Sequence, residues 1–194
     1  MEQKKPPHTP ASYRRQRQIE DCLYENLLRN PYQAVTVSDL CRQVGISRKA
    51  FYNYFPSKDA CFAAIIDRTI RDSVLHLAGL ASDGANPLRT YTAYLEYWKT
   101  QKPLLDIIVR NDLTYSFLLQ NLRHVTDEDK TVLDLLKTPQ VKSDMDILCC
   151  CMSAQLTLLL QWYSRGFDTP AEEMARKYLR LLYQPMFQMP EEKK

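Results

Sequence analysis

The stretch VGISRKAFYNYFPSK, from Val44 to Lys58, brings cations, amides and hydroxyls together within a short distance along the chain. Arginine and lysine side chains donate to guanine O6 and N7, asparagine pairs with adenine, and tyrosine hydroxyls bond to phosphate. All four residue types occur here directly after a glycine. The residue types therefore predict contacts to double-stranded DNA, with cations for phosphates and base edges.

The four aromatic rings of this stretch divide between two roles. Phe51 and Phe55 lie four residues apart, so on a helix they share the face that packs on a core. Tyr52 and Tyr54 fall outside that face, where their hydroxyls can bond to phosphate. Lys58 lies in the first turn of the next helix, where its ammonium and the unpaired backbone N–H groups would share one phosphate.

The residues predicted to contact DNA lie on this short helix or close to it. They include side chains at the start of the preceding helix and in the turn between the two. The complete set is Thr36, Ser38, Ser47, Arg48, Lys49, Ala50, Tyr52, Asn53, Tyr54 and Lys58. An ordinary helical hairpin with a basic surface is the alternative interpretation of the same residues.

Capping residues define the helices that must position these side chains. Thr36 or Ser38 caps a short helix that ends at Gly45, where a left-handed conformation costs least. Ser47 caps a second short helix, which ends at about Tyr54. Two short helices joined at a glycine and packed against a longer one make a helix-turn-helix.

Longer helices flank this motif in the sequence. The preceding helix begins at Ala11 and has three arginines near its start, Arg14, Arg15 and Arg17. The following helix begins after Ser57 and continues with an apolar stripe of helical period. These two helices would hold the motif in place.

Composition favours helices throughout the 194 residues. The chain has only four glycines, whereas all-β folds use glycine in hairpin turns. No run alternates apolar and polar residues for long enough to build a sheet. We therefore expect an all-α protein, with an N-terminal three-helix helix-turn-helix domain and a larger C-terminal helical domain.

Charge is distributed unevenly along the chain. The first 65 residues hold ten Lys and Arg against six Asp and Glu, and the remainder holds 16 against 17. A basic first third on a neutral remainder fits an anionic partner for that third. A basic surface exposed only to solvent is the alternative.

The segment TVSDLCRQVGISRKAFYNYFPSKDACF resembles the DNA-binding segment of the TetR (tetracycline-repressor-like) family of transcriptional regulators. The matching residues are Leu40, Cys41, Gly45, Ile46, Ser47, Tyr52, Tyr54, Phe55, Ser57 and Lys58. The resemblance covers residues 11–66. The sequence departs from the family pattern in two places, since Cys41 replaces the usual alanine and Lys49-Ala50 stands where Gly-Thr is common.

The resemblance implies a domain organisation and a mode of action. Residues 1–10 would be a disordered tail, 11–66 the DNA-binding domain, and 67–194 an effector-binding and dimerisation domain. Helices at about 143–165 and 169–184 would form a homodimer that binds a pseudo-palindromic operator. A small-molecule effector would then release the protein from DNA, as for a repressor, although activation stays open.

Aromatic side chains of the C-terminal part are either core residues or walls of an apolar effector site. The candidates for such walls are Tyr94, Trp98, Tyr115, Phe117 and Trp162. No charge cluster selects an ionic ligand. We expect no cofactor and no metal, and the sequence does not identify the effector.

Two other classes of function compete with this interpretation. Cys149–Cys151 could make the protein a thiol- or metal-responsive regulator, although consecutive helical residues point about 100° apart and do not converge on a metal. An enzyme is disfavoured because the chain has no G-x-G-x-x-G, P-loop, G-x-S-x-G or H-E-x-x-H motif. We therefore expect no catalytic residues.

The sequence also predicts where the protein is found. The N-terminal segment MEQKKPPHTP lacks the apolar stretch of a signal peptide. The apolar run from Ile147 to Tyr163 is shorter than the roughly 20 residues that a bilayer requires. We expect a cytoplasmic protein with reduced thiols and no membrane partner.

Overall fold

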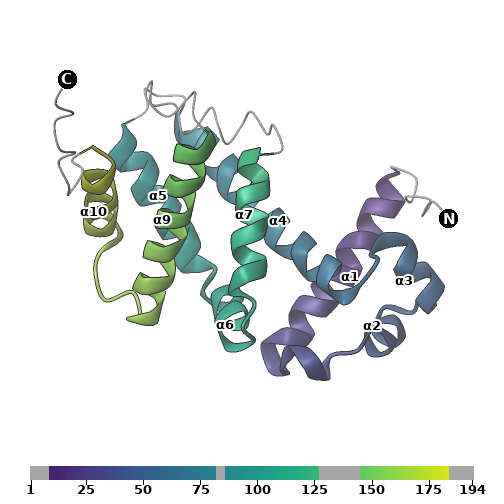
Figure 1. The fold of residues 1–194 in the computed structure, drawn as a ribbon. Coiled ribbons are helices and arrows are strands. Elements are labelled where there is room, and N and C mark those ends of the chain that lie inside the picture. The colour runs from purple at the N-terminus through teal and green to yellow at the C-terminus, as the bar shows by residue number, and fades with distance from the viewer. Residues whose placement is uncertain (1–8, 82–85, 127–144, 184–194) are drawn as a thin grey trace, which may run out of the picture. The chain divides into compact units, whose positions relative to one another are not determined.

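The computed structural model describes residues 9–81, 86–126 and 145–183. Within these ranges every regular element is a helix, which confirms the all-α prediction (Figure 1). The elements are α1 (Pro10–Arg29), the 3-10 helix η1 (Tyr32–Ala34), α2 (Val37–Val44), α3 (Arg48–Tyr54), α4 (Lys58–Ala81), α5 (Pro87–Thr100), α6 (Lys102–Arg110), α7 (Thr114–Thr126), α9 (Met145–Ser164) and α10 (Ala171–Tyr183). None of the described helices is long and apolar enough to span a bilayer.

The chain divides into two compact units. The N-terminal unit comprises Met1–Arg71 and Asp106–Gln120, and the C-terminal unit comprises Asp72–Leu105 and Asn121–Lys194. The sequence placed a single boundary after residue 66. The structural division differs because the segment Asp106–Gln120 packs with the N-terminal helices.

The start of α1 differs from the expected disordered tail at residues 1–10. Thr9 caps the helix by accepting from the backbone N–H of Ser12 at 3.2 Å, and Pro10 occupies the first helical position. Proline fits there because its fixed φ suits the helix and the missing N–H would be unpaired anyway. The helix therefore begins at the last residue of the predicted tail, and residues 1–8 lie outside the described ranges.

Apolar side chains from α1, α2, α3 and α4 form the core of the N-terminal unit. The most deeply buried of them are Ile19, Leu23, Leu27, Leu40, Phe51, Phe62, Ile65 and Ile66. They recur at helical spacing along α1 and α4, as expected for helices that each bury one face. This core fixes α2 and α3 against the two longer helices.

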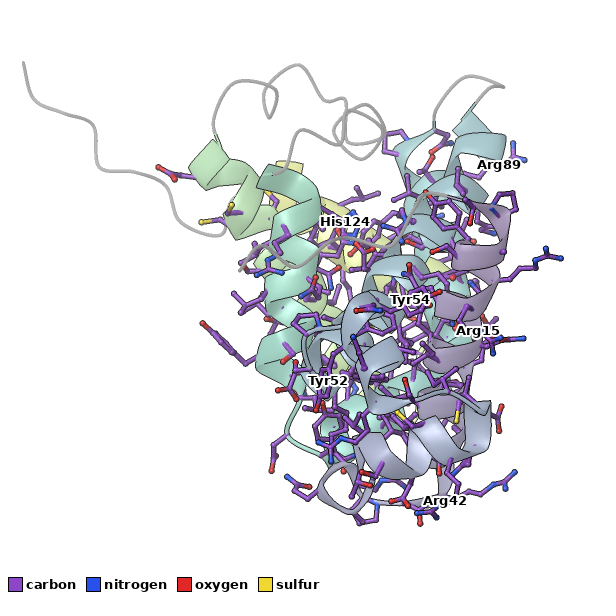
Figure 2. All side chains as sticks on the ribbon, turned by 90° about the vertical axis from the view of Figure 1, so that its right-hand side faces the viewer. Arg15, Arg42, Tyr52, Tyr54, Arg89 and His124 are labelled. Carbon is purple, nitrogen blue, oxygen red and sulfur yellow. The ribbon has the colours of Figure 1, made fainter. Side chains whose placement is uncertain are left out.

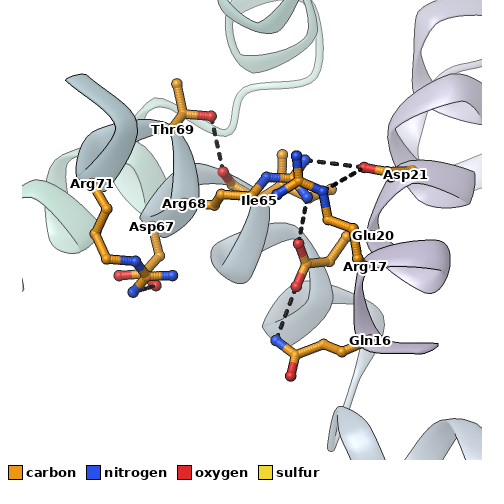
Figure 3. Close-up of polar contacts among 9 residues, drawn as sticks. All are labelled: Gln16, Arg17, Glu20, Asp21, Ile65, Asp67, Arg68, Thr69 and Arg71. Atoms are coloured by element: carbon orange, nitrogen blue, oxygen red, sulfur yellow. Dashed lines mark hydrogen bonds and ion pairs between the residues drawn. The ribbon is translucent and has the colours of Figure 1, made fainter. Parts of the chain in front are cut away.

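A polar network joins α1 to α4 within the same unit (Figure 3). The Arg68 guanidinium donates to Glu20 at 2.7 Å and to Asp21 at 3.2 Å, and Gln16 donates to the other Glu20 oxygen at 3.0 Å. Glu20 is only 4% exposed. A buried carboxylate needs such partners, because an unpaired charge in the interior is costly.

Helices α5, α9 and α10 contact one another in the C-terminal unit. The Tyr91 ring of α5 stacks on the Tyr178 ring of α10 with centroids 4.3 Å apart, and Tyr91 also stacks on Tyr94 at 5.5 Å. The Tyr178 hydroxyl donates to the carbonyl of Cys151 on α9 at 3.0 Å. Aromatic contacts between distant segments thus hold these three helices together.

The predicted long apolar helix at 143–165 corresponds to α9, which spans Met145–Ser164. It is followed by Gly166, whose φ of 68° is in the left-handed region. Residues 143 and 144 lie outside the described ranges. The second predicted dimer helix, 169–184, corresponds to α10, Ala171–Tyr183.

Candidate DNA-binding surface

The turn between α2 and α3 has the geometry that the sequence predicted. Thr36 caps α2 by accepting from the Asp39 N–H at 3.2 Å. Gly45 ends α2 with φ 70° and ψ 41°, which is the left-handed conformation that glycine adopts most easily. Ser47 then caps α3 by accepting from the Ala50 N–H at 3.1 Å. Local hydrogen bonds from Thr36 and Ser47 therefore fix the starts of α2 and α3.

The inner face of α3 is anchored by two rings. Phe51 is fully buried and Phe55 is 4% exposed, and their centroids lie 5.9 Å apart. The predicted division of the four aromatic residues is thus correct for these two. Because the core holds one side of α3, the opposite side is presented in a fixed orientation.

The outer face and first turn of α3 carry the predicted polar residues. Ser47, Arg48, Lys49 and Asn53 are exposed, and Tyr52 is 37% exposed. The Arg48 guanidinium lies 3.5 Å from both the Ser38 hydroxyl and the Tyr52 hydroxyl. These long contacts leave most of its five N–H donors available to a ligand.

The remaining predicted contact residues differ in exposure, since Thr36 and Ser38 are exposed and Lys58 is half-buried. Ala50 and Tyr54 are half-buried, and Figure 2 shows Tyr52 and Tyr54 on the face turned to the viewer. The Thr36 hydroxyl donates to the Asp39 carboxylate at 2.6 Å. That hydrogen bond comes first among the causes that hold the pKa of Asp39 below its usual value. Thr36 is thus committed mainly to capping α2.

Lys58 has a structural role that the sequence did not predict. Its ammonium donates to the backbone carbonyls of Tyr32 at 2.5 Å and Val35 at 2.8 Å, and lies 4.0 Å from the centroid of the Tyr32 ring. Partial burial lowers the pKa of Lys58, opposed by the nearby Asp59 carboxylate. With two carbonyls already bound, Lys58 fits the predicted phosphate contact less well than the exposed residues of α3 do.

Tyr32 extends these contacts to the rest of the N-terminal unit. Its hydroxyl donates to Asp59 at 2.5 Å, and its backbone N–H donates to the side chain of Asn111 at 2.7 Å. Burial, followed by the hydrogen bond to Asp59, raises the pKa of the Tyr32 hydroxyl. We call Tyr32, Val35, Lys58 and Asp59 the Lys58 cluster. It fixes the segment that leads into Thr36 and hence into α2.

The five predicted effector-site residues are divided between the two units. Tyr94, Trp98 and Trp162 are buried in the C-terminal unit, whereas Tyr115 and Phe117 belong to the N-terminal unit. Tyr115 is 70% exposed and so does not fit an enclosing wall. Sequence reasoning selected it as an aromatic residue on a middle helix, but its position on α7 faces solvent within its unit.

Buried polar groups accompany the aromatic residues of the C-terminal unit. The Tyr94 hydroxyl is buried, and this burial raises its pKa, opposed by the nearby side chains of Gln155 and Trp98. Trp162 donates from its indole N–H to the Thr169 carbonyl at 2.8 Å, which closes the turn between α9 and α10. Trp162 is therefore engaged in packing that turn, and Tyr94 lies in a more polar setting.

The three consecutive cysteines of α9 do not form a metal site in the described residues. Cys150 is exposed, while Cys149 and Cys151 are half-buried, as expected for neighbours that point in different directions on a helix. No group of three or more potential ligands occurs in the described ranges. Burial raises the pKa of the Cys151 thiol, which lowers its reactivity at neutral pH.

The N-terminal segment of the chain is similar in sequence to known bacterial regulatory proteins. Residues 25–65 match the family described as bacterial regulatory proteins, tetR family. The HTH-type transcriptional regulator EthR of Mycobacterium tuberculosis is 41% identical over 63 residues, which are 32% of this chain and 29% of EthR. The nucleoid occlusion factor SlmA of Shewanella amazonensis is 39% identical over 69 residues, 36% of this chain and 34% of SlmA. The chain thus matches about a third of the length of these curated relatives.

The similarity of fold extends further than the similarity of sequence. The structure of FadR from Bacillus subtilis in complex with stearoyl-CoA covers 88% of this chain and 99% of its own, with a TM-score of 0.59 and 13% identity. The fold and the α2–α3 surface define a helix-turn-helix protein. Residues 25–65 match the tetR family of bacterial regulatory proteins, so the resemblance drawn from the sequence motif is confirmed.

Proposed function

We propose that this protein is a transcriptional regulator that binds a specific DNA duplex through α3. The observation that carries the proposal is the exposed polar face of α3, fixed on its other side by Phe51 and Phe55. In helix-turn-helix proteins the second helix enters the major groove and its N-terminal residues contact base edges. Ser47, Arg48 and Lys49 occupy those positions here.

The residues of α3 divide by the contacts they are suited to make. Arg48 has the fork of donors that pairs with guanine O6 and N7, and Asn53 can pair with adenine. Lys49 and the Tyr52 hydroxyl suit phosphate or base edges at the groove. Arg48 is therefore the best candidate for base discrimination, and its loss would cost roughly 1–3 kcal/mol at one or two base pairs.

Selection of duplexes from a random pool, repeated with a variant, tests this proposal. We expect the wild-type protein to select one sequence and Arg48→Ala to relax the preference at one or two positions. Arg29→Ala is the matched control, because Arg29 is exposed at the far end of α1 and carries the same charge. If Arg48→Ala selects the same sequence with the same strength, α3 is not the reading element.

The proposal includes a homodimer that presents two copies of α3 to a pseudo-palindromic operator. On α9, Cys150, Ala154 and Leu158 recur at a spacing of four and are exposed or half-exposed. Such an apolar face on one copy is suited to the same face of another. The outer face of α10 carries the ion pairs Arg176–Glu172 and Lys177–Glu173, so we expect α9 to contribute the apolar part.

Sedimentation analysis tests the dimer. The wild-type protein is expected to sediment as a dimer at micromolar concentration, and Leu158→Asp as a monomer with unchanged helix content. Glu172→Ala, on the charged face of α10, is expected to leave the dimer intact. A wild-type monomer at these concentrations, both with and without its DNA, would contradict the proposal.

We also propose that a mostly apolar small molecule binds the C-terminal unit and lowers DNA affinity. FadR of Bacillus subtilis was solved with stearoyl-CoA, and this chain shares its fold. In the C-terminal unit the Tyr91 hydroxyl is buried, with no hydrogen-bond partner among the described residues. Buried polar groups normally have partners, so this hydroxyl is suited to orient a ligand group.

Titration of a ligand found by thermal-shift screening into the protein–DNA complex tests the effector. The ligand should weaken DNA binding, and DNA should weaken the ligand by the same factor, because coupling between two sites is reciprocal. Tyr91→Phe is the matched variant, since it removes only the hydroxyl. A ligand that binds tightly and leaves DNA affinity unaltered would show that the site is not regulatory.

A further inference from the structure

The first half of α1 is strongly basic. Between Pro10 and Ile19 it carries three arginines and no acidic residue. Arg17 pairs with Asp21 at 3.4 Å. Within the described ranges no carboxylate pairs with Arg14 or Arg15. Two adjacent positive charges on this part of α1 therefore have no carboxylate partner among the residues that the structure describes.

Arg15 is placed next to the end of α2. Its guanidinium lies 3.5 Å from the carbonyl oxygen of Val44, the last residue of α2, which directly precedes Gly45. Figure 2 shows the Arg15 side chain extending past the edge of α1 in the view that also contains Arg42 and Tyr52. The charge of Arg15 thus lies beside the turn that leads into α3.

This position matters because the N-terminal end of α3 is the part expected to enter the major groove. The walls of that groove are phosphate backbones, and cations beside an inserted helix lie close to them. The nearest acids along α1, Glu20 and Asp21, are already paired with Arg68. They do not neutralise the two arginines one to two turns earlier.

We propose that Arg14 and Arg15 form a second DNA contact, to the phosphate backbone that borders the groove receiving α3. The inference rests on the proposed function and adds to it a segment outside the helix-turn-helix motif. The planar guanidinium fork suits bidentate binding of phosphate, and Arg14 is exposed. Phosphate contacts position a protein and carry no base information, so this contact strengthens binding to any sequence.

Salt-dependent titrations test the contact. Wild-type protein, the pair Arg14→Ala/Arg15→Ala and the control Arg29→Ala are titrated into the selected duplex and a scrambled duplex at several salt concentrations. Each phosphate contact contributes about 0.9 to the slope of log K against log salt. We expect the alanine pair to flatten the slope by about 1.8 on both duplexes, and Arg29→Ala to leave it unchanged.

A charge-retaining variant separates binding from folding. Arg14→Lys/Arg15→Lys should restore most of the slope, although it lacks the guanidinium that lies beside Val44. Slopes that stay unchanged in the alanine pair overturn the proposal, and so does a loss confined to the selected duplex, which would indicate base contacts instead. A wild-type protein that binds both duplexes equally would overturn the proposed function, while the slopes would still decide the Arg14–Arg15 contact.

Discussion

The two units of this protein differ in the contacts that join the helices within each of them. In the N-terminal unit, charged and polar side chains join separate elements, as in the Arg68–Glu20 pair and the Lys58 cluster. In the C-terminal unit, stacked rings join α5 to α10. Polar contacts have directional geometry, whereas stacked rings tolerate small displacements. We infer that the contacts of the N-terminal unit hold its helices in one arrangement, and that those of the C-terminal unit allow small shifts between its helices.

The largest effect is expected from breaking the aromatic contact. Tyr178→Ala should lower the free energy of unfolding by about 3–5 kcal/mol, because it removes a buried ring that stacks on Tyr91. Tyr178→Phe keeps the ring and loses only the hydrogen bond to the Cys151 carbonyl, for a loss of about 1 kcal/mol. Urea unfolding followed by circular dichroism measures both. Equal losses for the two variants would mean that the stack contributes little.

The buried carboxylate of the N-terminal unit comes next. Glu20→Ala leaves the Arg68 guanidinium, only 17% exposed, without its closest partner, and should cost about 3 kcal/mol. Glu25→Ala is the control, because Glu25 forms an exposed pair with Arg29 at 4.0 Å and should cost less than about 1 kcal/mol. The same unfolding measurement applies. A cost for Glu20→Ala no larger than that of the control would show that the buried Arg68–Glu20 pair contributes little to the stability of the N-terminal unit.

Loss of the Lys58 ammonium should have a smaller effect on stability. Lys58→Met keeps the aliphatic stem and removes the donors to the Tyr32 and Val35 carbonyls, at a cost of about 1–2 kcal/mol. If Lys58 acts mainly within the Lys58 cluster, the salt slope of DNA binding should stay close to that of the wild type. A slope flatter by about one unit with unchanged stability would instead support the phosphate contact predicted from the sequence.

Two glycines offer a matched comparison between the units. Gly45 and Gly166 have φ angles of 70° and 68°, and an added Cβ would meet nothing within 4 Å at either position. Replacement of either by alanine should therefore cost about 1–2 kcal/mol from backbone strain alone. Only Gly45→Ala should also weaken DNA binding, since Gly45 sets the turn into α3. An equal loss of DNA affinity for Gly166→Ala would contradict the separate roles of the two units.

Much of the N-terminal unit could be predicted from the sequence because its signals are local. Thr36, Gly45 and Ser47 act within one helical turn of their own positions, so their spacing alone identifies the ends of α2 and α3. The inward direction of Phe51 and Phe55 follows from the helical period. These local signals gave the correct order of capped helix, left-handed turn and second helix.

Contacts between distant positions could not be predicted in the same way. Lys58 binds carbonyls more than 20 residues earlier in the chain, and Arg68 reaches Glu20 from 48 positions away. The stack of Tyr91 on Tyr178 depends on how α5 meets α10, which no short pattern encodes. For the same reason the sequence selected Tyr115 as an effector-site residue although its ring is exposed. The basic start of α1 was visible in the sequence, but its position beside Val44 required the structure.

Sequence-specific DNA binding is the claim on which the rest depends, and a competition between two duplexes tests it most directly. Fluorescence anisotropy of wild-type protein is measured with the selected duplex and with a scrambled duplex of equal length and composition, at about physiological salt. We predict that the selected duplex binds more tightly by a factor of about 10³ or more, as is typical of specific protein–DNA complexes. Equal affinities for the two duplexes would contradict the account.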